Sequence, residues 1–356
     1  MTEKKHALEF RAGPGAYDEI RSHGFSLASV GTILGASGGP KWLVLSQLDR
    51  VLAQRVLPAL RAPVHLLGSS IGAWRFACYG QADPVAAIAR FEDAYIRQTY
   101  SASPDVAEIT AKSREILCTI LGTQGVREIM THPVLRTHIM TVRSCPPMTT
   151  DNRTLLGMGL MLAATTNLAS RTALGLFFQR ALFYDARDIP PFFDAGGFPM
   201  QRVPLSADNL GEAVIASGSI PMVLHGVRNI PGATPGVYRD GGIIDYHLDL
   251  PVSQPGTITL FPHFFGTIIP GWFDKSLPWR KPKPANIDRT VLICPSPDFI
   301  QRLPHAKVPD RTDFKTMSES ERISCWSRVV RECQALADEL AEVLDTESVA
   351  ARLKPL

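Results

Sequence analysis

The chain has 356 residues, of which 45% are hydrophobic and 20% charged, with a net charge of +3 and a mean hydropathy of +0.03. These values suit a soluble globular protein with a sizeable core, and the scattering of basic among acidic residues gives no reason to expect a nucleic-acid partner. The six cysteines contain no C-x-x-C pair, so we expect reduced core thiols. No apolar stretch long enough for a signal peptide follows the first six residues, which predicts a cytoplasmic protein.

The first predicted elements form two consecutive strand, turn and helix units. Residues 29–34 read as a short buried strand, which is followed by a glycine-rich turn over 35–41 and an apolar-periodic helix over 42–60. An apolar run at 63–67, a sharp turn at 68–72 and a second helical segment repeat this plan at once. Two such units predict a parallel sheet with helices on its faces.

Further along the chain, apolar residues fall at helical spacing between about 84 and 132, and a helical stretch begins at Asn209. Short apolar runs predict strands at 137–142, 257–261 and 290–294. A closing helix is expected over about 319–344. We find no internal repeat and no separating linker. The simplest interpretation is one α/β domain over 1–356, with a motif-bearing core over about 29–252 and a C-terminal extension over about 253–356.

The pentapeptide Gly68-Ser69-Ser70-Ile71-Gly72 has the pattern G-x-S-x-G between a predicted strand and a predicted helix. A sharp turn in this position lifts a serine hydroxyl clear of the sheet edge, and only glycine leaves room for the tight backbone on either side. Ser70 is therefore the candidate nucleophile, with Gly68 and Gly72 in support.

The run Ser37-Gly38-Gly39 also lies between a strand and a helix. Backbone without side chains can present consecutive N–H groups to a ligand there, and a helix N-terminus adds positive partial charge. Gly38 and Gly39 are therefore candidate donors to an oxyanion. The alternatives are a plain structural turn and a phosphate-binding loop, although the run matches neither nucleotide-binding glycine pattern.

Asp240 ends a probable strand and is followed by Gly241 and Gly242. Parallel sheets place ligands at this edge, and a buried aspartate with a raised pKa is able to accept the serine proton. An aspartate that only shapes the turn is the alternative. A further segment, Ala216 to Pro221, follows a helical stretch and is also compatible with an ordinary helix end.

Together these segments resemble the patatin-like phospholipase family in their order along the chain. The family pattern is a G-G-x-[KR] loop, G-x-S-x-G, A-S-x-x-x-P and D-G-[GA]; here the segments are Gly38 to Lys41, Gly68 to Gly72, Ala216 to Pro221 and Asp240 to Gly242. The resemblance spans about 29–252. It implies a three-layer α/β/α fold with a mainly parallel sheet and helical insertions, and a serine-aspartate dyad without histidine that hydrolyses acyl esters of lipids. It also implies that Ser70 is the nucleophile, Asp240 the base, Gly38 and Gly39 the oxyanion donors, and Lys41 a supporting cation.

Histidine is the alternative base, because most G-x-S-x-G hydrolases order their triad as serine, acid and histidine. His247, His263 and His305 all follow Asp240 in the chain. A lone histidine is more often an ordinary core or surface residue. The family resemblance favours the dyad.

Two segments bear on the substrate. Residues 261–284 combine six aromatic residues with basic residues, which suits either an interfacial loop that meets a lipid surface or a proline-rich loop whose aromatic rings pack on the core. Residues 155–178 are apolar and long enough to span a bilayer, but their polar residues favour a buried helical hairpin or an acyl-chain wall.

The sequence therefore predicts a serine acyl hydrolase, either cytoplasmic or peripherally membrane-associated, acting on a lipid or other acyl ester without metal or cofactor. The alternatives are an acyltransferase or thioesterase with the same nucleophile, and a catalytically silent lipid-binding protein.

Overall fold

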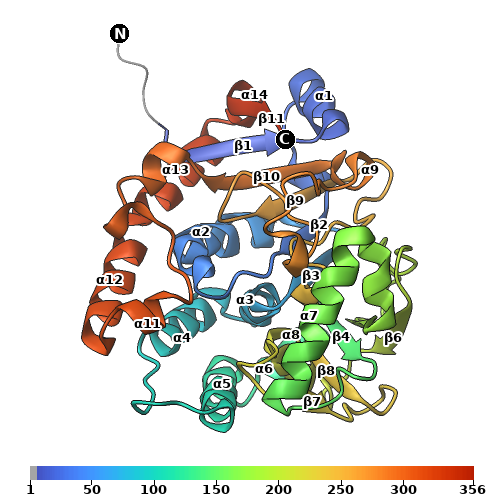
Figure 1. The fold of residues 1–356 in the computed structure, drawn as a ribbon. Coiled ribbons are helices and arrows are strands. Elements are labelled where there is room, and N and C mark those ends of the chain that lie inside the picture. The colour runs from blue at the N-terminus through green and yellow to red at the C-terminus, as the bar shows by residue number, and fades with distance from the viewer. Residues whose placement is uncertain (1–5) are drawn as a thin grey trace.

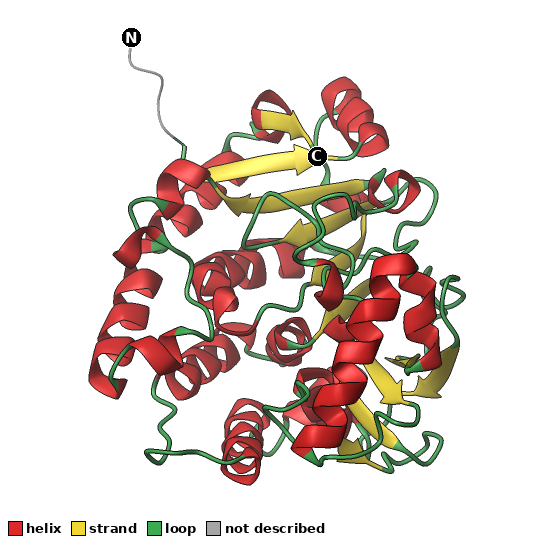
Figure 2. Cartoon of the chain, in the orientation of Figure 1, coloured by secondary structure: helices red, strands yellow, loops and turns green. Residues whose placement is uncertain are grey.

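The computed structural model describes residues 6–356, which fold around one large sheet flanked by helices (Figures 1 and 2). Residues 1–5, which belong to the segment behind the prediction of a cytoplasmic protein, lie outside the described residues. Six of the ten strand pairs are parallel, so the sheet is mainly parallel, as predicted. The fold is of the mixed α/β class.

The strand order in the sheet is β11-β1-β10-β9-β2-β3-β4-β5-β6, and β8 pairs with both β4 and β7. The strands are β1 (Leu8–Ala12), β2 (Val30–Gly35), β3 (Val64–Ser69), β4 (Leu135–Ser144), β5 (Phe178–Tyr184), β6 (Met200–Pro204), β7 (Val227–Arg228), β8 (Val237–Asp240), β9 (Ile258–Pro262), β10 (Thr290–Pro295) and β11 (Leu353–Pro355). The parallel strands β2, β3, β9 and β10 lie where the sequence predicts strands. Because β9 pairs with β2, the extension after residue 252 shares a sheet with the motif-bearing core.

The helices lie on two sides of this sheet. Figure 1 shows α2, α3, α4, α12 and α13 to its left, and α7 and α9 to its right. The helices are α1 (Pro14–His23), α2 (Ser46–Val51), α3 (Ile71–Tyr79), α4 (Pro84–Ile96), α5 (Val106–Leu121), α6 (Gly125–Thr131), α7 (Arg153–Ala169), α8 (Leu210–Gly218), α9 (Pro284–Ile287), α10 (Pro297–Ile300), α11 (Asp313–Thr316), α12 (Glu319–Glu332), α13 (Gln334–Asp345) and α14 (Val349–Arg352).

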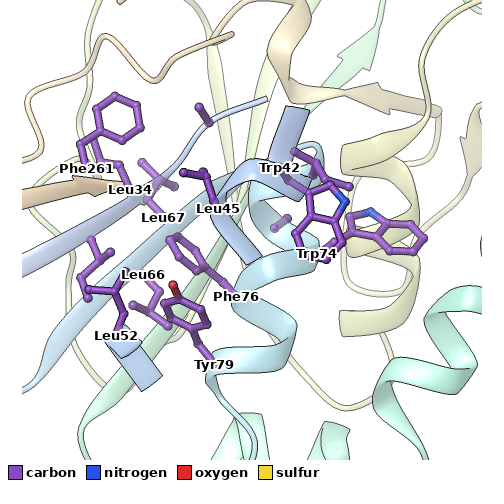
Figure 3. Close-up of a cluster of buried hydrophobic side chains, with 14 of the residues drawn as sticks. Leu34, Trp42, Leu45, Leu52, Leu66, Leu67, Trp74, Phe76, Tyr79 and Phe261 are labelled. Atoms are coloured by element: carbon purple, nitrogen blue, oxygen red, sulfur yellow. The ribbon is translucent and has the colours of Figure 1, made fainter. Parts of the chain in front are cut away.

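The main hydrophobic core lies between the central strands and α2 and α3 (Figure 3). Every residue of β3 is buried, as expected for a parallel strand that is covered on both faces. Leu66 and Phe76 are completely buried in this core. The strand and the helix that flank Ser70 are therefore held by packing on both sides of the turn.

Two predicted helices are less regular than expected. Residues 42–60 form a 3-10 helix over Gly39–Leu45 and the short α2, followed by irregular helical turns to Ala59, rather than one α-helix. Pro40 and Pro58 lie at the starts of the first and last of these helices, where proline is tolerated because the first-turn N–H groups have no partner. The predicted closing helix is two helices, α12 and α13, that meet at Cys333.

The six cysteines are all free thiols, but the expectation that they lie in the core holds for only half of them. Cys78, Cys294 and Cys333 are buried, whereas Cys118 is exposed, and Cys145 and Cys325 are half-buried. The apolar neighbours of Cys118 in the sequence lie on the buried side of α5, because successive helical residues point in different directions.

Candidate active site

Ser70 lies at a sharp turn between the end of β3 and the start of α3. Its backbone has φ 54° and ψ −127°, a conformation that residues other than glycine rarely adopt and that costs about 1–3 kcal/mol. A Cβ atom at Gly72 would lie 1.9 Å from the carbonyl oxygen of Gly35, and one at Gly68 would lie 2.5 Å from the backbone of Ala73. Both glycines of the pentapeptide are therefore required by close backbone packing around the serine.

The Ser70 hydroxyl donates a hydrogen bond to the Asp240 carboxylate, with 2.7 Å between Oγ and Oδ2. These residues are 170 positions apart, and both are buried. Burial raises the pKa of Asp240, while the hydrogen bond from Ser70 and the nearby charge of Arg311 oppose this rise. A carboxylate with a raised pKa is a stronger base than an exposed one, so the pair has the geometry and the electrostatics of a nucleophile with its base.

Asp240 is fixed by the turn that follows it. Its Oδ1 accepts a hydrogen bond from the N–H of Gly242 at 2.7 Å, and its own N–H donates to the carbonyl of Ser219 at 3.0 Å. A Cβ atom at Gly241 would lie 2.2 Å from the carbonyl oxygen of Met140. Asp240 therefore does both things that the sequence left open. It shapes the D-G-G turn through Gly242, and it contacts the Ser70 hydroxyl as a base must.

The loop from Ser37 to Gly39 lies against both of these turns. The Ser37 hydroxyl donates to Ser69 Oγ at 3.0 Å, and a Cβ atom at Gly242 would lie 2.4 Å from Ser37 Oγ. Gly39 has φ 56°, which favours glycine. Among residues 6–356, no protein group accepts a hydrogen bond from the N–H of Gly38 or Gly39. Gly38 lines a small cavity together with Ser70, and Gly39 lines the larger cavity beside Ser70.

Ser217 has a role that the sequence analysis did not assign. The N–H of Ser70 donates to Ser217 Oγ at 2.8 Å, and the Ser217 hydroxyl donates to the carbonyl of Met140 at 2.7 Å. Ser217 therefore ties the strained turn of the candidate nucleophile to β4. The sequence did contain a sign of this role, because Ser217 belongs to the segment Ala216 to Pro221 of the family pattern. Without the resemblance, this segment is indistinguishable from an ordinary helix end.

Positive charge gathers beside the pair. Arg311 lines both the small cavity and a larger one at Ser70, and a Cβ atom at Gly39 would lie 3.3 Å from Arg311 Nε. None of the ion pairs within residues 6–356 involves Arg311. Lys275 lies over the Tyr246 ring, and desolvation together with the charges of Arg311 and Lys41 lowers the pKa of Lys275 to about 7. Arg311 was missed in the sequence because it lies in a short polar loop outside every motif.

Lys41, the supporting cation of the family pattern, is the second residue after Gly39 in the 3-10 helix that follows the glycine loop. Burial lowers the pKa of Lys41, and the charge of Asp310 opposes that shift. Lys41 does not line either of the cavities that contain Ser70. The nearby charges of Arg311 and Lys307 also lower the pKa of Lys41, so this amine lies among charges of both signs.

A cavity of about 560 Å³ opens directly beside Ser70. Its wall is mostly apolar, with residues from α3, α5, α11 and the segment after α8; these include Ile71, Trp74, Ile116, Ile220, Met222 and Phe314. Arg153, Arg311 and Lys315 provide its positively charged lining. A volume in this range with a mostly apolar wall suits a small organic ligand or an acyl chain.

The histidines lie elsewhere. His247 and His263 are buried with their rings 4.3 Å apart, and burial lowers the pKa of both, so both rings are neutral. The Nδ1 atom of His247 accepts a hydrogen bond from the N–H of Ile269, and that of His263 lies beside the backbone of Phe265. His305 is in the short 3-10 helix Pro304–Ala306 that follows α10. Among residues 6–356, none of these rings is hydrogen-bonded to Ser70 or Asp240.

The two substrate-side segments differ from their expected burial. Five of the six aromatic residues in 261–284 are buried or half-buried, and Trp279 is 66% exposed. Residues 155–178 form most of α7 and a following 3-10 helix. They are not a buried hairpin, because five of the seven leucine and methionine side chains of α7 are more than half exposed. None of the helices in residues 6–356 combines the length and hydropathy needed to cross a bilayer.

The chain has no matching family model, and no curated protein matches it. Among solved structures it is similar to VipD from Legionella pneumophila, with 12% identity and a TM-score of 0.31 over 75% of this chain and 56% of that one. It is also similar to a chain of the heterodimeric ExoU-SpcU complex from the type III secretion system of Pseudomonas aeruginosa, with 12% identity and a TM-score of 0.30 over 88% of this chain and 52% of that one. The chain thus corresponds to about half the length of each of these proteins. Similarity at this level bears on neither activity nor substrate.

Proposed function

We propose that the protein is a serine acyl hydrolase that cleaves esters of lipids or similar amphiphiles, with Ser70 as nucleophile and Asp240 as base. The observation that carries the proposal is the 2.7 Å hydrogen bond from the Ser70 hydroxyl to the buried Asp240 carboxylate. The resemblance of the motifs to the patatin-like phospholipases, which implies the same dyad, is consistent with it.

In the first step, Ser70 Oγ attacks the carbonyl carbon of the ester while Asp240 Oδ2 accepts its proton. The protonated Asp240 then gives this proton to the departing alcohol oxygen, which leaves an acyl group on Ser70. In the second step, Asp240 takes a proton from water as the water oxygen attacks the acyl carbon. The proton returns to Ser70 Oγ as the acid is released, so both residues are regenerated.

The negative charge that develops on the carbonyl oxygen needs donors that are already in place. The unpaired N–H groups of Gly38 and Gly39 supply such donors, and the start of α3 adds positive partial charge. Arg311 adds a full charge on the same side. The apolar cavity of about 560 Å³ beside Ser70 supplies a place for the acyl chain.

The experiment is labelling of the purified protein by a fluorophosphonate probe, followed by hydrolysis of p-nitrophenyl esters on the same samples. We expect labelling in the wild type and its loss in Ser70→Ala, with hydrolysis falling by about 10⁴-fold or more. Asp240→Asn keeps the shape of the carboxylate without its basicity, so it should also lose hydrolysis. Ser113→Ala is the matched control, because Ser113 lines the same cavity but its hydroxyl donates to the carbonyl of Ile109.

Each outcome distinguishes the proposal from its alternatives. Labelling in Ser70→Ala, or hydrolysis that survives Asp240→Asn, would contradict the dyad. A product that follows the concentration of an added alcohol, or a preference for coenzyme A thioesters, would point to an acyltransferase or thioesterase. Absence of both labelling and hydrolysis in the folded wild type would favour the silent lipid-binding protein.

A further inference from the structure

Helix α7 is apolar on both of its faces. Its inner face packs on a small second core; Leu156, Gly159, Ala163 and Asn167 are buried at helical spacing. A Cβ atom at Gly159 would lie 2.4 Å from Met148 Sδ, so this contact is close. An inner face that is already packed leaves the outer face of the helix with no role in holding the fold.

The outer face carries five large apolar side chains that are each more than half exposed. They are Leu155, Met158, Met161, Leu162 and Leu168, with exposed fractions from 51% to 65%. Leu155, Met158 and Met161 are spaced by three residues and Leu162 follows Met161 directly, while Leu168 lies one further turn along, beyond the exposed Thr165. At 3.6 residues per turn, all five lie on one side of the helix. A contiguous exposed apolar stripe is typical of an interaction site, whereas single exposed apolar residues are common on any protein.

Trp279 is exposed in a loop that lies at the C-terminal end of α7. The Arg280 guanidinium donates a hydrogen bond to the carbonyl of Asn167 at 2.7 Å, which brings the loop with Trp279 to the C-terminal half of α7. The Asn167 amide in turn donates to Asp274 at 2.8 Å. We call these six exposed side chains, Leu155, Met158, Met161, Leu162, Leu168 and Trp279, the α7 face.

The exposed charges at the ends of the α7 face are basic: Arg153, Lys281 and Lys283. Asp274, which contacts Asn167, is buried and pairs with Arg171 and Arg280. No aspartate or glutamate occurs from residue 152 to residue 184, while Arg153 begins α7 and Arg171 follows it. Arg280, Lys281 and Lys283 follow Trp279, again without an acidic neighbour up to Ile287. An apolar stripe with basic residues at both ends, and with a tryptophan among them, matches the chemistry of an anionic lipid surface.

The α7 face also borders the cavity at Ser70. Arg153, the first residue of α7, lines that cavity, and so does Met222, whose terminal methyl lies 4.0 Å from the position of a Cβ atom at Gly157. Figure 1 shows α7 in the foreground of the molecule, in front of α8 and β4. A lipid layer on this face would therefore lie next to the cavity opening.

We propose that the α7 face docks onto the surface of an anionic lipid bilayer, with α7 lying along the surface. The 17 residues of α7 measure about 25 Å at 1.5 Å per residue, which suits a helix lying in the interface. Self-association through this face is disfavoured, because a symmetric dimer brings the same surface of two copies together and would place like-charged arginine and lysine side chains close to each other. Docking is additional to hydrolysis and is measurable without turnover.

The test uses the full-length Ser70→Ala protein, so that hydrolysis cannot alter the lipid. Its co-sedimentation is measured with vesicles of phosphatidylcholine alone and with vesicles that contain 30% phosphatidylglycerol, a composition chosen for the assay at about physiological salt. We expect binding to the anionic vesicles that weakens as salt is raised. The double variant Met161→Glu/Leu168→Glu should bind at least 10-fold more weakly, and Lys281→Gln/Lys283→Gln should lose the dependence on anionic lipid.

Ile189→Glu is the matched control. Ile189 is also apolar and 72% exposed, but it lies away from α7. Its neighbour Asp188 pairs with Arg136 near the start of β4, whereas α7 follows the opposite end of that strand. This variant should bind vesicles like its parent. Far-ultraviolet circular dichroism and size-exclusion chromatography of every variant exclude misfolding as the cause of a loss. The proposal is overturned if the parent does not bind, if the double variant binds equally well, or if the double variant only converts a dimer to a monomer.

Discussion

Around Ser70, polar side chains are buried and meet one another, whereas along the outer side of α7 apolar side chains are exposed to solvent. Ser70, Asp240 and Ser217 are nearly or completely inaccessible, and each is hydrogen-bonded within the protein. Met161, by contrast, is 65% exposed. Both regions invert the usual arrangement of polar and apolar groups.

The two regions differ in what offsets the free-energy cost of these unusual positions. Burying a polar group costs free energy unless a partner satisfies it, and the turns around Ser70 supply these partners from four separate segments of the chain. Exposing a large apolar side chain costs less per residue, and among residues 6–356 the chain provides nothing to cover the α7 face. The buried polar groups around Ser70 find their partners within the chain. The exposed apolar side chains of the α7 face would be covered only by a partner such as the proposed lipid surface.

The largest loss of stability is expected from filling the space at the turn that carries Ser70. Gly72→Ala would place a methyl group 1.9 Å from the Gly35 carbonyl oxygen, so β2 and α3 must separate. We expect a loss of more than about 4 kcal/mol in the free energy of unfolding, or no folded protein at all. Urea denaturation measures it. Gly211→Ala is the control, because a Cβ atom at that glycine in α8 meets nothing within 4 Å; equal behaviour of the two variants would contradict the close packing.

A smaller effect is expected from Ser217→Ala. The variant leaves the N–H of Ser70 and the carbonyl of Met140 without their buried partner, which costs about 1–3 kcal/mol. Because Ser217 positions Ser70 without touching the base, the rate of fluorophosphonate labelling should fall about 10-fold or more while the pH dependence keeps its shape. Unchanged labelling, with the same loss of stability, would make Ser217 a purely structural residue.

The pH profile tests the electrostatics of the buried pair. Asp240 acts as a base only when it is deprotonated, so kcat/KM should fall as pH drops through its raised pKa. Arg311→Gln removes a positive charge that favours the carboxylate, so the pKa of Asp240 should rise further. The acidic limb of the profile should therefore move to higher pH, by less than about one unit. Lys281→Gln serves as the control, and a limb that stays in place or moves to lower pH in Arg311→Gln would contradict the assignment.

The smallest effect is expected on the outer side of α7. Met161→Ala removes a side chain that is 65% exposed, so the free energy of unfolding should change by no more than about 0.5 kcal/mol. Leu156→Ala on the inner side of the same helix, where the residue is 2% exposed, should cost about 2–5 kcal/mol. Urea denaturation of both variants compares the two faces directly. A large loss in Met161→Ala would mean that the outer face helps to hold the fold.

The sequence predicted the parts of the fold whose pattern is local. The buried strands β2, β3, β9 and β10 are short apolar runs, and runs of this kind need no knowledge of distant residues. Strands β1 and β6 were missed because each is only five residues long and includes charged or amide side chains, so their place in the sheet depends on their neighbours.

In the candidate site, too, the residues in local motifs were predicted and those placed by distant packing were not. Ser70, Asp240 and the glycine loop carry motifs of a few residues, and the structure brings these segments together. Arg311 carries no such motif and reaches the site through the packing of a loop from the extension. The outward stripe of α7 was taken for a buried segment, because composition alone does not tell which apolar side chains find a partner.

The pairing at one edge of the sheet has a consequence for how the protein is made. Within residues 6–356, the only strands that pair with β1 (Leu8–Ala12) are β10 and β11, which belong to the last 67 of the 356 residues. β1 therefore leaves the ribosome long before either neighbouring strand has been synthesised, and this edge stays unpaired until both have emerged. Contacts so distant along the chain favour slow closure of the sheet at this edge.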